Sequence, residues 1–112
     1  MNIENIKIED AKKGFDNRDR SVVSFSVVGD GTGTAWIFNL ENPTDVKRLN
    51  KLMQYAEVNQ PEHLNGKEFR AVISDNFLHG FGHPIQDKYI PISSELFQEV
   101  TEAEFAELLK PN

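Results

Sequence analysis

The residues best suited to chemistry lie in one segment, residues 75–89. It supplies imidazole and carboxylate groups that could bind a metal ion or form an acid/base pair: His79, His83, Asp75 and Asp87. The two histidines are four residues apart, but Gly80 and Gly82 oppose the helix that would place them on one face. We therefore expect a bulged strand leading into a turn, and an enzyme that uses His79 or His83 is only the third alternative.

Other catalytic and cofactor patterns are missing from the sequence. The chain has no cysteine, which excludes a thiol nucleophile, a disulfide framework and a cysteine zinc site. The glycine-rich run 29–33 joins two expected strands, which favours a hairpin turn over a phosphate-binding loop before a helix. We predict no catalytic residue, no metal ion and no cofactor.

The segment 80–89 also has the composition of a recognition surface. Gly80, Gly82 and Pro84 all weaken a strand, so their joint presence indicates a backbone path that few residues can follow. Around this path lie side chains suited to binding: Phe81, His83, Lys88 and Tyr89. The prediction is a defined turn that carries the functional surface, and the alternative is a bulged hairpin with ordinary turn chemistry.

A second candidate combines a cationic loop with an aromatic hairpin. Arg18 and Arg20 lie in a charged loop, 10–20, next to strands that carry aromatic residues (Phe25, Trp36 and Phe38). Proteins that bind single strands stack bases on aromatic rings and follow the phosphates with cations. The competing interpretation is that the aromatics belong to the core and that aspartates offset the cations of a solvated loop. The predicted ligand-binding residues are Arg18, Arg20, Phe81, His83, Lys88 and Tyr89.

Composition and charge narrow the class of protein. The 112 residues suit a single domain, 1–112, and no apolar run approaches the ~20 residues of a membrane span or resembles an export signal. We expect a cytoplasmic protein. The net charge is −6, and residues 93–112 contribute five glutamates against one lysine. This negative charge argues against nonspecific binding to duplex DNA.

The elements that must position these groups follow from alternation and capping signals. Strands are expected near 3–9, 21–28, 34–40, 67–74 and 77–81, with a short edge strand at 88–92. Asn42 and Pro43 predict a helix to about Glu57, and Thr101 with Glu104 predicts a short C-terminal helix. We predict an α+β fold: a small antiparallel sheet or OB-like barrel of about five strands, with its main helix after the third strand. The core should contain Phe25, Trp36, Phe38, Leu49, Met53, Phe69 and Ile73.

Two stretches of the sequence resemble a known group of proteins. Residues 64–72 contain a Leu-x-Gly-Lys strand start, and residues 80–89 contain a Gly-His-x-Ile-x-Asp-Lys-aromatic turn. Together they resemble short uncharacterised proteins of phages and prophages of Gram-positive bacteria, although Tyr89-Ile90 stands where Trp-Phe is expected. The element order is more faintly similar to phage OB-type single-strand binders. The resemblance implies an origin in a mobile element and implies no reaction.

These observations favour a non-enzymatic accessory protein of phage type that acts by binding. In the first version it binds single-stranded nucleic acid through an OB-like face. In the alternative its acidic surface binds and modulates a host protein, as a nucleic-acid mimic would. The sequence makes no prediction of the oligomeric state.

Overall fold

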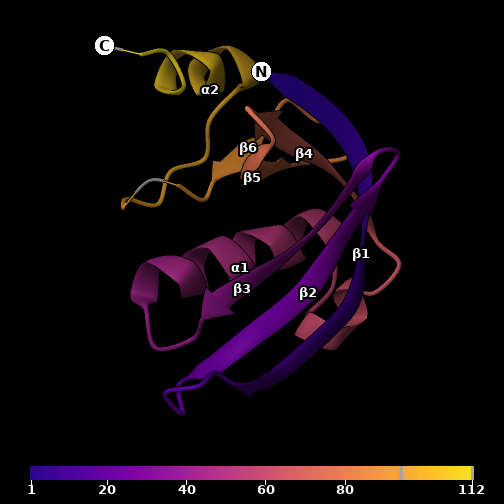
Figure 1. The fold of residues 1–112 in the computed structure, drawn as a ribbon, viewed down its shortest axis with the longest axis vertical. Helices are drawn as coiled ribbons and strands as arrows, with labels where there is room; N and C mark the ends of the chain where they lie inside the picture. The colour runs from indigo at the N-terminus through magenta and orange to yellow at the C-terminus, as the bar shows by residue number, and fades with distance from the viewer. Residues whose placement is uncertain (94, 112) are drawn as a thin grey trace.

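The computed structural model describes residues 1–93 and 95–111, with Thr32 described by its main chain alone. Over these residues the fold is α+β, and six strands form one antiparallel sheet in the order β3-β2-β1-β4-β5-β6. The sheet curls into a half-barrel around helix α1 (Pro43–Ala56), and helix α2 (Glu102–Leu108) lies beyond β5 and β6 (Figure 1). The expected sheet with one main helix and a short C-terminal helix is confirmed, but the expected count of about five strands is one too few.

Strand β1 (Asn2–Phe15) is shared by both halves of the sheet. It pairs with β4 (Glu68–Ser74) at its beginning and with β2 (Ser21–Gly29) from Ile6 onward. The strand predicted at 3–9 is therefore present, whereas the prediction that 10–15 belongs to a loop is wrong.

A bulge explains this error. The register of β1 on β2 shifts between Glu9 and Lys12, where Asp10 has a φ of 55°. Ala11 is buried, and its N–H donates to Oδ1 of Asn65 at 2.7 Å. The bulge interrupts the period-2 pattern from which a strand is recognised, so the second half of β1 looks irregular in sequence.

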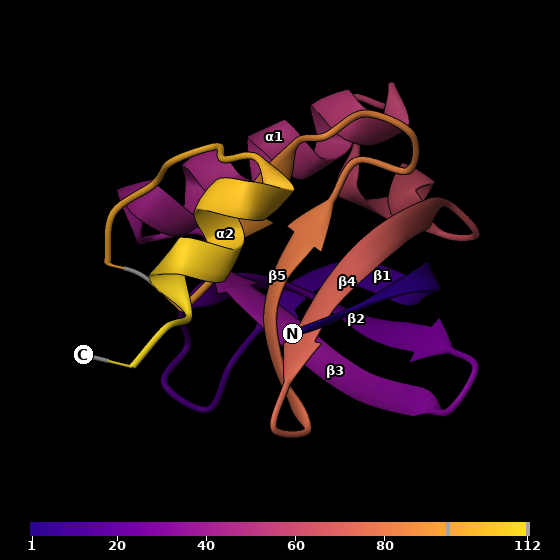
Figure 2. The same ribbon diagram turned by 90° about the horizontal axis from the view of Figure 1, so that it is seen from above.

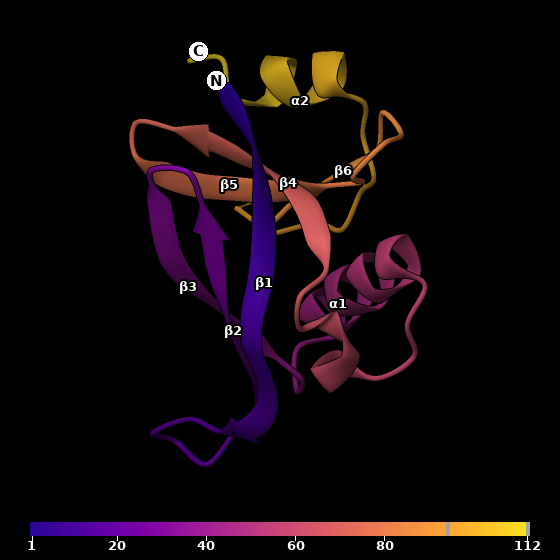
Figure 3. The ribbon, with the colours of Figure 1, turned by 90° about the vertical axis from the view of Figure 1, so that its right-hand side faces the viewer.

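Two hairpins complete the sheet. Strand β3 (Thr32–Asn39) returns on β2 as predicted. Strand β5 (Phe77–Gly82) returns on β4 through Asp75 and Asn76, both at positive φ, and β6 (Tyr89–Pro91) is the far edge. In Figure 3 β4, β5 and β6 lie in the upper part of the view, β1 runs from the top to the bottom, and the β1–β2 loop lies at the bottom, far from β6. The prediction of an edge strand near 88–92 is confirmed.

Both helices begin at the predicted caps. The side chain of Asn42 accepts from the N–H groups of Thr44 and Asp45, and Thr101 with Glu104 forms a complete capping box. The connection after α1 contains a short 3-10 helix, η1 (Pro61–Leu64), where a loop was expected. Among the described residues, no helix has the length and apolar character needed to cross a membrane.

The core has two parts. The larger one fills the hollow of the sheet against α1, and there Phe25, Phe38, Leu49 and Phe69 are buried as predicted. The other three predicted core residues, Trp36, Met53 and Ile73, are partly buried against it. The smaller part lies between the sheet and α2, which is beside β5 in Figure 2, and consists of Val72, Tyr89, Val100 and Phe105.

Candidate nucleic-acid interface

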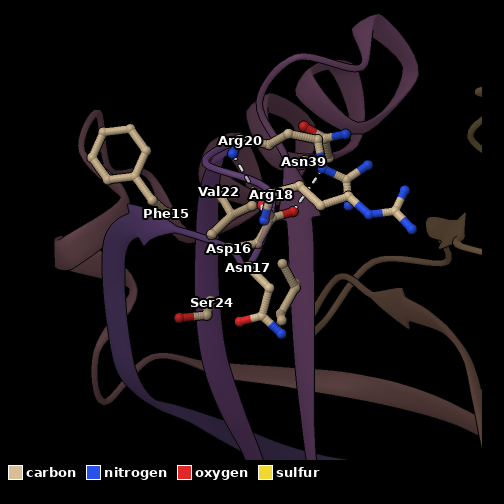
Figure 4. Close-up of a pocket in the computed structure, with 9 residues that line it drawn as sticks. Phe15, Asp16, Asn17, Arg18, Arg20, Val22, Ser24 and Asn39 are labelled. Atoms are coloured by element: carbon tan, nitrogen blue, oxygen red, sulfur yellow. Dashed lines mark hydrogen bonds and ion pairs between the residues drawn. The ribbon is translucent and has the colours of Figure 1, made fainter.

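A concavity lies where the β1–β2 loop meets the outer face of β2 and β3. Its volume is about 780 Å³, and Figure 4 shows eight of its lining residues with labels. The lining consists of Phe15, Asp16, Asn17, Arg18, Arg20, Val22, Ser24, Ile37 and Asn39. Both arginines that the sequence singled out therefore belong to one surface.

Hydrogen bonds to Asp16 hold the loop in shape. Its Oδ1 accepts from the N–H groups of Arg18 at 2.8 Å and Arg20 at 3.0 Å, and its Oδ2 accepts from Nε of Arg20 at 2.7 Å. The main-chain hydrogen bond from Arg20 is the largest cause that lowers the pKa of Asp16 below 3.8. Since this carboxylate offsets the charge of Arg20, the guanidinium of Arg18 is left without an ion pair or hydrogen bond within the described part of the chain.

The strand residues that line the concavity are the polar Ser24 and Asn39 and the apolar Val22 and Ile37. Ser24 on β2 lies between Ile37 of β3 and Lys12 of β1 in the register of the sheet. Ile37 is 54% exposed, and Phe15 at the end of β1 is 74% exposed. The ring of Phe15 projects away from the two arginines in Figure 4. Phe15 and the two arginines thus line one open surface, although the Phe15 ring points away from the arginines. Single-strand binders combine exposed aromatic rings with cations.

The aromatic residues considered from sequence are not the ones exposed here. Phe25 and Phe38 are buried on the opposite face of the hairpin, with ring centroids 5.9 Å apart, so the competing interpretation as core residues is correct for both. Phe15 was missed because it follows the bulge and lies in a segment that was assigned to a loop. The available signal was that it is the one aromatic residue among the charged residues of 10–20.

The turn after β5 is built differently from the β1–β2 loop. Phe81 is completely buried, and Tyr89 is 1% exposed with its hydroxyl accepting from the guanidinium of Arg70 at 3.0 Å. Nδ1 of His83 accepts from the N–H groups of Ile85 and Gln86, at 3.1 and 3.0 Å. Of the four candidates in this turn, Lys88 is the exposed one and His83 is partly exposed.

The six predicted ligand-binding residues do not form one surface. Arg18 and Arg20 lie at the β1–β2 end, whereas the other four lie at the β5–β6 end, in the opposite half of the molecule (Figures 1 and 3). The turn at 80–89 is defined, as expected, but Phe81 and Tyr89 face the interior. Packing explains the glycine at position 82, because a Cβ there would come within 2.5 Å of the Tyr89 ring.

The histidines of 75–89 contact a carbonyl group and a ring, and Oδ1 of Asp87 accepts from the N–H of Glu102 at 2.7 Å. Nε2 of His79 lies 3.3 Å from the carbonyl oxygen of Ser74, and the ring of His83 contacts Tyr55 edge-on at 5.2 Å between centroids. Within the described ranges, no three His, Asp or Glu side chains are grouped as metal ligands.

A partly buried hydrogen bond joins the C-terminal segment to α1. The hydroxyl of Tyr55 donates to Oε2 of Glu99 at 2.5 Å, and Nζ of Lys51 lies 4.0 Å from the same oxygen. Burial, and then the Glu99 carboxylate, raises the pKa of Tyr55. This cluster therefore holds a neutral tyrosine and has a structural role.

Comparison with models of known protein families, with curated proteins and with solved structures gives no match for the chain.

Proposed function

We propose that this protein binds single-stranded nucleic acid, without catalysis, on the outer face of β1, β2 and β3 beside the β1–β2 loop. The main observation is a concavity lined by Phe15, whose side chain is exposed, and by Arg18, whose guanidinium has no ion pair or hydrogen bond within the described residues. Stacking on a ring is tolerant of sequence because every base has a π-face, and a nearby cation contacts the phosphates.

The position of this surface on the sheet is similar to that of the binding face in OB barrels. OB barrels bind oligonucleotides on the face of their second and third strands, between the first and fourth connecting loops. Here the concavity lies on β2 and β3, the β1–β2 loop borders it, and the main helix follows β3. The fainter similarity of the element order to phage OB-type single-strand binders supports the same proposal.

Charge limits the strength of this binding. The loop and the end of β1 carry four cations, Lys12, Lys13, Arg18 and Arg20, among three aspartates, and Arg20 is paired with Asp16. If Lys12 and Arg18 make the phosphate contacts, log Kobs should fall with log[salt] with a slope of about −1.4. We therefore propose weak binding to short single strands, supported by stacking as much as by charge.

Fluorescence anisotropy with a labelled single-stranded oligonucleotide tests this proposal. Phe15→Ala should weaken binding by about 1–3 kcal/mol, and Arg18→Gln should weaken it and reduce the salt slope by about 0.7. Phe77→Ala is the matched control, because Phe77 is 68% exposed at the tip of the β4–β5 hairpin. Equal affinities of the Phe15 and Phe77 variants would contradict the proposed surface.

The alternative function is binding to a basic host protein through the acidic C-terminal segment. The observation in its favour is that exposed leucines, Leu96 at 75% and Leu108 at 50%, lie among exposed glutamates of 95–107. A Leu108→Ala, Glu107→Gln variant that loses a captured basic partner while keeping oligonucleotide affinity would favour this second function.

A further inference from the structure

The outward main-chain groups of β3, at the edge of the sheet, are a feature that neither proposed function uses. The N–H of Leu40 donates to the carbonyl oxygen of Ser21, which makes Ser21 and Leu40 a hydrogen-bonded pair of the β2–β3 ladder. Such pairs alternate with non-hydrogen-bonded pairs in an antiparallel ladder. Every second residue of β3 therefore directs its main-chain groups away from β2. These residues are Asn39, Ile37, Ala35 and Gly33.

Most of this edge has no partner. The N–H of Asn39 donates to Oδ2 of Asp45 at 2.9 Å. For the main-chain groups of Gly33, Ala35 and Ile37, the described residues supply no hydrogen bond. All three residues are exposed, so a row of main-chain donors and acceptors is open to an added strand.

The edge of β3 also lacks the charges, prolines and bulges that block strand addition. Residues 31–40 contain no charged residue and no proline, and β3 pairs with β2 without a register shift. The other edge of the sheet differs, because β6 is three residues long, contains Pro91 and is bridged to Val100. Exposed edges of natural sheets normally carry charges, prolines or bulges. We therefore expect another strand to pair with this long, uncharged edge.

We propose that a second copy of this chain pairs with β3, antiparallel and about a two-fold axis at Ala35. In this register Ala35 lies opposite Ala35 of the second copy, and each Ile37 lies opposite a Gly33. These three pairs would exchange six main-chain hydrogen bonds and join the two sheets into one.

Shape and charge favour a second copy as the occupant. Ile37 is half-exposed on the outer face and would lie next to a glycine, so the bulky residue meets an open position across the interface. Each chain has a net charge of −6, and the uncharged residues 31–40 allow two copies to meet without placing like charges opposite each other. The proposal is independent of nucleic-acid binding, because its readout is the mass of the protein alone.

Sedimentation equilibrium over a concentration series tests the dimer. The wild-type chain should approach twice its monomer mass, and Ala35→Lys should remain a monomer because each lysine would face its own symmetry mate. Ser26→Lys is the matched control, since Ser26 is opposite Ala35 on the same face but one strand inside the edge. A wild-type monomer at every concentration, or a dimer that survives Ala35→Lys, would overturn the proposal.

A crosslink tests the register. The chain has no cysteine, so Ala35→Cys introduces a single thiol. The Cα atoms of a hydrogen-bonded antiparallel pair are about 5.5 Å apart, which suits a disulfide. Oxidation should convert Ala35→Cys into a covalent dimer and leave Ser26→Cys largely uncrosslinked. Equal yields for the two variants would contradict pairing through β3.

Discussion

The β1–β2 loop and the turn after β5 contain the same kinds of side chains but use them in opposite ways. Both have an aromatic ring, a cation and hydrogen-bonding groups. In the first, Phe15 is exposed and Arg18 is unpaired within the described chain. In the second, Phe81 and Tyr89 are buried and His83 caps its own turn. The comparison teaches that composition identifies a recognition surface only when no neighbouring element covers it. In the second region α2 covers Tyr89, and the main core encloses Phe81.

The largest expected effect separates the two aromatic residues. Phe81→Ala should lower the free energy of unfolding by about 3–5 kcal/mol, because its ring is buried against Phe25 at 5.7 Å between centroids. Phe15→Ala should change it by no more than about 0.5 kcal/mol. Urea denaturation measures both, and a stability loss at Phe15 as large as that at Phe81 would show that Phe15 is a core residue.

Glycine substitutions extend the comparison to the backbone. Gly82→Ala should cost about 1–3 kcal/mol, because its Cβ would overlap the ring of Tyr89. Gly14→Ala, in the β1–β2 region, has no atom within 4 Å of the new Cβ and should change stability by less than about 0.5 kcal/mol. Thermal denaturation of the two variants gives the test. Similar melting temperatures would mean that the Tyr89 ring can move to accept the new Cβ.

The cap of α2 tests what keeps Tyr89 covered. Thr101→Ala removes the acceptor for the N–H of Glu104 and should cost about 1 kcal/mol. Fraying of α2 should also speed amide exchange at Tyr89 and leave exchange in β2 unchanged. Hydrogen exchange followed by NMR measures this, and uniform acceleration would show that α2 unfolds only with the whole domain.

The smallest expected effect concerns Asp16. Its pKa is lowered in the folded chain, so its contribution to stability is complete above the ordinary pKa of 3.8 and is lost as the pH falls through the folded pKa. Because the main-chain N–H of Arg20 is the largest cause, Arg20→Gln should leave the pKa of Asp16 lowered. A carboxyl titration by NMR that returns to the ordinary value in this variant would assign the shift to the guanidinium instead.

The sequence by itself determined the local elements of this protein. Alternation in 21–28 and 34–40 predicted a hairpin, and the side chains of Asn42 and Thr101 predicted the starts of both helices. These features depend on hydrogen bonds and side-chain directions within a few residues, which are readable from the order of residue types.

Only the tertiary structure decided which candidate groups are available. The bulge at Asp10 depends on Asn65, which is 54 residues from Ala11 in the chain, and it places the exposed ring of Phe15 at the end of β1. Tyr89 is buried because Phe105 of α2 packs against it, with ring centroids 6.2 Å apart. The free edge of β3 follows from the strand order of the whole sheet. Contacts between distant segments set exposure, and one sequence pattern does not specify which segments will meet.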